Sequence, residues 1–292
     1  MKNVGLIGVG VMGKLIVPRI RDAGHKLYLY DVSQEALLKV SGRGVEAAAS
    51  PVEVASRADI VLMSLPGPRQ VEEVVNGREG LLTKARPGMV LVDLSTVDPR
   101  TTQSMAAAAA QKEVGYLDAP VLGRPASVGE WSLPVGGDAA SLAKCIDILK
   151  LFARNVFHIG PSGSGNKIKL LNQMMFSAIN SMTAEMMAVA GQVGIEPKLL
   201  YETISASQAA TVSGLFKELG KRIASGDYDN PTFQVDLLVK DVSLAIAMAQ
   251  DSGAVPSLTK VTQQMNEKAQ SNGLGKKDTS EMWKVWRDNS IT

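Results

Sequence analysis

The chain has 292 residues but few of the side chains on which thiol and metal chemistry depends. Its one cysteine, Cys145, excludes an internal disulfide and a thiolate metal cluster. Only two histidines, His25 and His158, are present, so neither a histidine-based zinc site nor a catalytic triad is expected. We therefore predict no bound metal.

Excess charge and long apolar runs are also missing. The formal net charge is +2, which gives no argument for a nucleic acid or an anionic membrane as partner. No apolar run approaches the length of a membrane span. The apolar start, Met1–Gly13, is interrupted by glycines and no small-residue cleavage site follows it, so a signal peptide is not favoured. We expect a cytoplasmic protein with no membrane partner and, with 45% hydrophobic residues, a packed core.

The first half of the chain alternates short β-like runs with helical stretches. This alternation predicts a doubly wound, mostly parallel sheet in an α/β domain. The runs with the pattern of buried strands are Val4–Gly8, Leu27–Tyr30, Ile60–Ser64 and Met89–Asp93, with further strands expected at Gly115–Asp118, Ser132–Val135 and Asn155–Ile159.

The pattern of alternating strands and helices ends at Gly160-Pro161-Ser162-Gly163. The following stretch, about 166–193, contains no proline and predicts a helix about 40 Å long, which would join two domains. We predict domains at 1–161 and 162–292, the second all-helical. Its methionines are interpreted as core or subunit-interface packing. Later helices are expected at Pro197–Ser207, Val212–Ser225, Thr232–Ser252 and Pro256–Ser271.

The stretch Gly8-Val-Gly-Val-Met-Gly13 fits the dinucleotide fingerprint between a strand and a helix. Gly8 permits the tight turn, Gly10 lets a pyrophosphate approach the backbone, and Gly13 allows close helix–strand packing. Asp31 ends the second strand about 20 residues further on, where a carboxylate binds ribose hydroxyls and repels a 2′-phosphate. The domain at 1–161 is therefore predicted to be an NAD-binding Rossmann domain, with NADP less favoured. Val11 and Met12 complete the predicted phosphate loop.

Two further strand exits carry candidate cofactor contacts, because ligands bind at the carboxyl ends of strands in open α/β sheets. Leu65 and Pro66 follow the third predicted strand, and Ser95 and Thr96 follow the fourth. We predict that Leu65, Pro66 and Thr96 contact the cofactor. Ser95 and Thr96 have an alternative role, capping the helix that starts after Pro99.

Lys169, Asn172 and Gln173 share one face of the long predicted helix, because residues three and four apart are neighbours there. An ammonium beside two side-chain amides holds a carbonyl oxygen and delivers a proton to it. The alternative is a lysine on an amphipathic helix whose ammonium reaches solvent.

The chain resembles the β-hydroxyacid dehydrogenase family, which includes 3-hydroxyisobutyrate dehydrogenases, over nearly its whole length. The resemblance rests on the Gly8–Gly13 fingerprint, Asp93-Leu-Ser-Thr96, Asp118-Ala-Pro-Val121, Gly163–Gln173, and Phe233 through Lys240-Asp241. It implies that Lys169 is the acid/base residue, that Asn172 binds substrate and that Lys240 lies near the nicotinamide. It also implies a Rossmann domain, a long interdomain helix and an all-helical C-terminal domain, with the active site in the cleft between the domains and a homodimer or homotetramer.

One loop departs from the family pattern Asp-Ala-Pro-Val-Ser-Gly-Gly. Leu122 replaces the serine and Arg124 the last glycine. A guanidinium offers a bidentate clamp for a carboxylate or sulfonate, and this loop is similar to that of sulfolactaldehyde reductases in the same family. A solvated arginine is the alternative. The predicted substrate-binding residues are Gly123, Arg124, Asn172, Gln173 and Phe176.

Other side chains near these motifs leave alternatives open. Ser127, Trp131 and Ser132 are candidates to line the cleft. Asp236 and Asp241 are candidates to orient Lys240, to cap a helix or to form a surface ion pair.

The predicted function is an NAD-dependent dehydrogenase of a short β-hydroxy acid, or an anionic analogue, acting with lysine acid/base catalysis. One alternative is an imine reductase on the same scaffold, which usually lacks the lysine. Another is a non-catalytic dinucleotide-binding assembly protein, which tends to lose it. A 6-phosphogluconate dehydrogenase is related, but this chain is short for that enzyme's larger helical domain.

Overall fold

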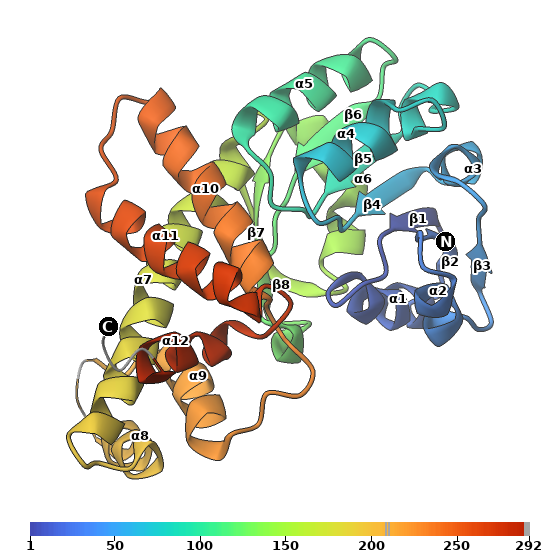
Figure 1. Cartoon of the computed structure of the whole chain (residues 1–292). Helices are drawn as coiled ribbons and strands as arrows, with labels where there is room; N and C mark the ends of the chain where they lie inside the picture. The colour runs from blue at the N-terminus through green and yellow to red at the C-terminus, as the bar shows by residue number, and fades with distance from the viewer. Residues whose placement is uncertain (208, 210, 289–292) are drawn as a thin grey trace. The chain divides into compact units, whose positions relative to one another are not determined.

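A computed structural model describes residues 1–207, 209 and 211–288. By its internal contacts the chain divides into two compact units, Met1–Lys169 and Leu170–Thr292. The first unit contains the sheet and the second is helical (Figure 1). This confirms the predicted fold class. Among the described residues, no helix is both long enough and apolar enough to cross a membrane.

The sheet of the first unit has eight strands in the order β3-β2-β1-β4-β5-β6-β7-β8. All neighbouring pairs are parallel except β6 and β7. The chain crosses from β3 to β4 beside β1, and this reversal creates the switch point at which ligands bind in such sheets. The strands are β1 (Asn3–Ile7), β2 (Lys26–Tyr30), β3 (Val45–Ala47), β4 (Ile60–Met63), β5 (Val90–Asp93), β6 (Gly115–Asp118), β7 (Trp131–Gly136) and β8 (Ala153–Gly160).

Central strands β4 and β5 are buried along their whole length, as their apolar runs predict for parallel strands covered on both faces. One apolar cluster packs α1, α2 and α6 on one face, and a second packs α3, α4 and α5 on the other. These helices are α1 (Gly13–Asp22), α2 (Gln34–Val40), α3 (Pro51–Arg57), α4 (Pro68–Asn76), α5 (Pro99–Ala110) and α6 (Ala139–Leu149). Every strand that the sequence predicts is present, and the short β3 is an addition.

The start of α5 corrects one expectation. Asp98 is the N-cap, and its carboxylate accepts a hydrogen bond from the Thr101 backbone N–H at 2.9 Å. Capping of this helix by Ser95 or Thr96 is therefore wrong. Pro99 occupies the first helical position, where its missing N–H costs nothing.

The long helix α7 (Ser164–Gln192) begins in the first unit and continues into the second. It is followed by α8 (Pro197–Ala206), α9 (Gly214–Ser225), α10 (Val235–Asp251), α11 (Ser257–Ala269) and α12 (Trp283–Asp288). The apolar core of the second unit is small and includes Leu238, Val242 and Met282. Buried polar side chains supplement it, among them Ser177 and Asn266, which hydrogen-bond each other at 2.9 Å.

Candidate active site

In the glycine loop after β1, the first and last glycines are packed against the protein backbone, whereas the middle one has free space beside it. Gly8 has φ +89°, and a Cβ there would collide with the Ser64 carbonyl. A Cβ at Gly13 would collide with the Gly8 carbonyl, so only glycine lets α1 pack this close to the turn. At Gly10 a Cβ would meet no heavy atom within 4 Å. The loop thus reserves room where a pyrophosphate approaches the backbone.

Asp31 stands beside this loop at the end of β2. Its Oδ2 accepts the Val9 backbone N–H and its Oδ1 accepts the Ser33 backbone N–H, both at 2.8 Å. Helix α1 has Met12 as N-cap, without a side-chain cap and without an acidic residue in its first turn. Its N-terminal N–H groups therefore suit an anionic ligand. These residues fit a dinucleotide.

The loops that follow β4 and β5 are joined by Ser95. Its hydroxyl oxygen accepts the Leu65 backbone N–H at 2.9 Å, and its side chain is buried. Pro66 is exposed and Thr96 is half-buried. Leu65, Pro66 and Thr96 thus lie at the carboxyl ends of neighbouring strands, with Ser95 holding the two loops together.

The first turn of α7 is anchored by Asp118, the last residue of β6. Its Oδ1 accepts the Gly163 backbone N–H and its Oδ2 accepts that of Asn166, both at 2.8 Å. These N–H groups have no partner within the helix, so the Asp118 carboxylate on β6 caps the N-terminus of α7. At Gly165 a Cβ would collide with the carbonyls of Pro134 and Asp118, so glycine permits the close approach.

Asn166 ties the same turn to the loop after β5. Its Oδ1 accepts the Val97 backbone N–H and its Nδ2 donates to the Thr102 hydroxyl, both at 3.2 Å. One turn further along, Lys169 Nζ donates to the Val121 carbonyl at 2.8 Å. The start of α7 is therefore fixed to the loops after β5 and β6, and Lys169 lies at the carboxyl edge of the sheet.

The carboxyl group of Asp118 lies beside a second buried carboxyl, that of Asp93. Asp93 and Asp118 are register partners on β5 and β6, and Tyr116 donates its hydroxyl to Asp93 Oδ2 at 3.1 Å. Burial raises the pKa of Asp93 to about 6, with the nearby Asp118 charge adding to it. Burial likewise raises the pKa of Asp118 to about 6, against the opposing effect of its backbone N–H donors. The pKa of the Tyr116 hydroxyl is raised well above its usual value, mainly by burial.

The loop that departs from the family pattern is held by Trp131. The indole N–H donates to the Arg124 carbonyl at 2.8 Å, and a Cβ at Gly123 would collide with the indole ring. Arg124 precedes a short 3₁₀ turn, Pro125–Ser127, and its carbonyl also accepts the Ser127 hydroxyl at 3.0 Å. Trp131 is fully buried, so the expectation that it lines a cleft is wrong. It fixes the loop's main chain instead.

In the second unit, Asp241 links two predicted site residues. Its Oδ2 accepts the Gln173 side-chain amide at 2.6 Å, and its Oδ1 pairs with Lys240 Nζ at 2.7 Å. Asn172 donates to Gln173 Oε1 at 3.2 Å, which extends the network. Asp241 is buried, and its carboxylate contacts Lys240. The other candidate, Asp236, pairs with Lys276 instead.

Phe176 lies one turn beyond Asn172 on α7. Its ring packs edge-to-face on Phe233, with ring centroids 5.2 Å apart. The sequence alone predicts no site role for Asp118 or Asn166, and it does not predict the hydrogen bond between Asp241 and Gln173. The only local signals were an aspartate at a strand end and the adjacency of Lys240 and Asp241.

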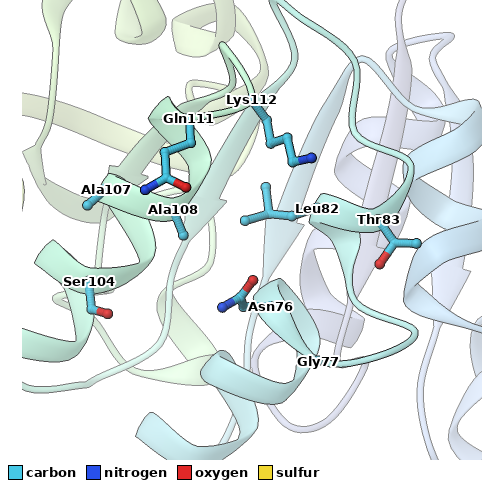
Figure 2. Close-up of a pocket in the computed structure, with 9 residues that line it drawn as sticks. All are labelled: Asn76, Gly77, Leu82, Thr83, Ser104, Ala107, Ala108, Gln111 and Lys112. Carbon is cyan, nitrogen blue, oxygen red and sulfur yellow. The ribbon is translucent and has the colours of Figure 1, made fainter.

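A hollow of about 560 Å³ lies elsewhere on the first unit, where α4 and α5 end (Figure 2). Both helices return the chain to the amino ends of the strands, the edge opposite the glycine loop. None of its lining residues is a predicted site residue. They are Asn76, Gly77, Leu82, Thr83, Ser104, Ala107, Ala108, Gln111 and Lys112.

The sheet order, the glycine loop and the carboxylate after β2 define a dinucleotide-binding α/β unit. Residues 3–160 match the model of the NAD binding domain of 6-phosphogluconate dehydrogenase. Residues 163–286 match that described as NAD-binding of NADP-dependent 3-hydroxyisobutyrate dehydrogenase. The chain belongs to the β-hydroxyacid dehydrogenase family of NAD(P)-dependent oxidoreductases acting on CH–OH groups.

Individual relatives agree with this assignment. A 2-(hydroxymethyl)glutarate dehydrogenase of Eubacterium barkeri is 31% identical over 286 residues, 97% of this chain and 94% of the relative. A 3-hydroxyisobutyrate dehydrogenase of Pseudomonas aeruginosa is 33% identical over 257 residues, 86% of each chain. The crystal structure of a 3-hydroxyisobutyrate dehydrogenase from Salmonella typhimurium has a TM-score of 0.91 at 28% identity, over 98% of this chain and 100% of that one. An imine reductase from a Pseudomonas species is more distant, with a TM-score of 0.64 at 18% identity, over 97% of this chain and 99% of that one, and shares the fold alone.

Proposed function

We propose that the protein interconverts a short β-hydroxy acid, or an anionic analogue, and its semialdehyde or keto form, with Lys169 as the acid/base residue. One observation carries the proposal. Lys169 Nζ, hydrogen-bonded to Val121, lies at the end of a helical turn that Asp118 and Asn166 anchor to the sheet edge of the glycine loop. Hydride and proton transfer act on adjacent atoms of the substrate, so their donors are needed at one edge.

In the oxidation direction, a neutral Lys169 accepts the proton of the substrate hydroxyl as the adjacent carbon loses hydride. In reduction, its ammonium donates that proton to the developing alkoxide. The nicotinamide, when bound, accepts or supplies the hydride. Asn172 and Gln173 are proposed to hold the substrate oxygens, and Asp241 to orient Lys240.

NAD is proposed as the cofactor rather than NADP. The support is Asp31, whose carboxylate is fixed beside the glycine loop by two backbone N–H groups. A negative charge there binds the ribose hydroxyls and repels a 2′-phosphate. Val32 and Ser33 follow it, so no adjacent cation offsets this charge. The proposed contacts of the cofactor are Gly8, Gly10, Val11, Met12, Gly13, Asp31, Leu65, Pro66, Thr96 and Lys240.

The proposed substrate is small and anionic. Relatives are named for hydroxymethylglutarate, threonate, hydroxyisobutyrate and serine, all small hydroxy acids. Gly123, Arg124 and Phe176 are proposed to complete the pocket, with Arg124 clamping a carboxylate or sulfonate. The proposal includes a cytoplasmic location and a homodimer or homotetramer.

The test is an assay of NADH oxidation with succinic semialdehyde, tartronate semialdehyde, methylmalonate semialdehyde, glyoxylate and sulfolactaldehyde, repeated with NADPH. We expect turnover of at least one of these, faster with NADH at equal concentration. Saturable NADH binding without turnover of any of them would contradict the proposed reaction. A preference for NADPH would contradict the role of Asp31 alone.

A further inference from the structure

The loop between β6 and β7 carries two of the proposed substrate-binding residues, Gly123 and Arg124, and its two ends are held together. Leu122 and Ser132 form a backbone bridge, in which the Leu122 N–H donates to the Ser132 carbonyl at 2.9 Å and the Ser132 N–H donates back at 3.1 Å. Within the loop, the Arg124 carbonyl accepts the Ser127 N–H at 3.0 Å. The main chain on both sides of Gly123 is therefore hydrogen-bonded inside the first unit.

Trp131, the first residue of β7, contacts both of these proposed substrate-binding residues. Its indole N–H donates to the Arg124 carbonyl at 2.8 Å, and its ring lies so close to Gly123 that a Cβ there would collide with it. The Trp131 side chain is fully buried and packs edge-to-face on Phe152, with ring centroids 6.3 Å apart. A buried N–H that loses its acceptor destabilises the fold, so the indole resists movement of the Arg124 main chain.

The same loop also contacts Lys169, the proposed acid/base residue. Lys169 Nζ donates to the carbonyl of Val121 at 2.8 Å, and Val121 lies three residues before Arg124. One end of the Val121–Arg124 segment thus holds the ammonium, and Trp131 holds the other end. The separation between Lys169 and the main chain of Arg124 is consequently set by the protein before a substrate binds.

We propose that Trp131 is a positioning residue that determines which substrates fit, by fixing the main chain from which the Arg124 guanidinium reaches the substrate anion. This role rests on the proposed function, in which Lys169 exchanges a proton with the reacting oxygen and Arg124 binds the anion. A substrate must then span a set separation between the two groups. Hydroxy acids whose anion and hydroxyl lie closer together or further apart bind less well. A pre-organised clamp also favours the substrate that fits, since less conformational entropy is lost on binding.

Trp131→Phe tests this role, because it keeps an aromatic ring in the core and removes the N–H. The substrate is whichever of the five aldehydes named above the wild type reduces fastest. We expect its KM to rise about 10-fold, the scale of one lost hydrogen bond, while kcat and the KM for NADH stay near wild type. The KM values of the more slowly reduced aldehydes should rise less, so that selectivity falls. An unchanged KM for the best substrate would overturn the role of Trp131.

Two control variants separate this effect from a general loosening of the loop or the core. Arg19→Ala removes a hydrogen bond from the other end of the same loop, where Arg19 donates to the Val128 carbonyl at 3.0 Å. Phe152→Leu disturbs the packing around Trp131 but leaves the indole N–H in place. Both variants should keep the substrate KM near wild type, although Phe152→Leu lowers the free energy of unfolding. A rise in KM as large as that of Trp131→Phe in either control would overturn the specific role of the indole.

A double-mutant cycle tests whether Trp131 acts through Arg124. In the Arg124→Ala background, Trp131→Phe should change kcat/KM for the best substrate by less than about two-fold, because the clamp that it positions is already gone. An effect as large as in the wild-type background would mean that the indole acts on the substrate by another route, and would overturn the proposal.

Hydrogen exchange followed by mass spectrometry needs no substrate and distinguishes failure of this role from failure of the proposed function. The backbone amides of residues 122–130 should exchange faster in Trp131→Phe than in wild type, with the rest of the first unit unchanged. A wild type that reduces none of the aldehydes would overturn the proposed function, and the specificity role with it. An active wild type, with neither loop exchange nor substrate KM altered in Trp131→Phe, would overturn the role of Trp131 alone.

Discussion

Two aspartates at the same edge of the sheet make the same kind of hydrogen bonds but differ in what they hold in place. Asp31 follows β2 and accepts two backbone N–H groups, one of them from the glycine loop. Asp118 ends β6 and accepts two backbone N–H groups from the start of α7. Asp31 is half-buried beside an open loop, whereas Asp118 is fully buried. The first leaves room for a ligand, and the second holds a helix.

The difference in burial affects how readily each of the two carboxyl groups ionises. A carboxylate with both oxygens accepting N–H groups favours ionisation, but desolvation opposes it. At Asp118 desolvation is the larger effect, and its pKa is about 6. The ionised form that anchors α7 therefore exists at neutral pH at some cost in folding free energy. Asn166, which Asp118 binds, lies one turn before Lys169, so we expect this carboxylate to help fix the position of Lys169.

Replacing Lys169 tests whether the residue that follows the Asp118 anchor takes part in catalysis. Lys169→Ala is expected to lower kcat by about 10³-fold, within the range for loss of a general acid/base. NADH binding, measured by fluorescence titration, should persist because the glycine loop is untouched. Lys167→Ala, an exposed lysine two residues away, is the control and should keep its activity. Full turnover by Lys169→Ala would remove it as the acid/base residue.

The pH dependence of stability tests the burial side of the comparison. Asp93 and Asp118 have folded pKa values of about 6, above the ordinary 3.8 expected of the unfolded chain. The folded state therefore binds these protons more tightly between about pH 4 and pH 6, and the free energy of unfolding falls as pH rises through that window. A shift of this size changes it by up to about 3 kcal/mol for one carboxyl.

Urea unfolding at pH 4.5 and pH 7 measures this effect as the difference between wild type and Asp118→Asn, which cancels the titrating groups that do not interact with Asp118. Wild type should gain stability relative to the variant at the lower pH. An unchanged difference at the two pH values would mean that Asp118 is not desolvated as described.

These two aspartates also show what the sequence could predict. Asp31 was found because its partners belong to a local fingerprint, and the central strands were found because their apolar runs are local too. Asp118 is not predicted as an anchor because its partner Asn166 is 48 residues away, and the bond of Asp241 to Gln173 is not predicted because the two are 68 residues apart. An aspartate beside a lysine fits a surface ion pair equally well, and only burial distinguishes the two. The edge strand β3 was missed because Val45-Glu-Ala47 has no apolar run.

Turnover of Asp118→Asn tests the anchor directly. The amide turns one acceptor into a donor that faces a backbone N–H, so the first turn of α7 shifts and Lys169 with it. We expect kcat to fall by about 10²-fold, the scale of a misplacement of roughly 1 Å, with little change in the KM for NADH. Asp138→Asn makes the same substitution at a comparable cap of α6, where Asp138 accepts the Ser141 N–H at 2.8 Å, and should leave kcat unchanged. Equal losses of kcat in both variants would mean that Asp118 contributes only to the general stability of the fold.

Asp31→Asn tests the ligand-facing aspartate, and its effect should be the smallest. The variant keeps the side chain's shape but loses the charge that strengthens its bonds to ribose hydroxyls, so the KM for NADH should rise about 10-fold. The KM for NADPH should fall, because the 2′-phosphate no longer meets a negative charge. Kcat at saturating NADH should stay near wild type, since Lys169 and its anchor are untouched. A fall in kcat with unchanged KM values would mean that Asp31, like Asp118, acts by holding the protein's own backbone, and the contrast between the two aspartates would disappear.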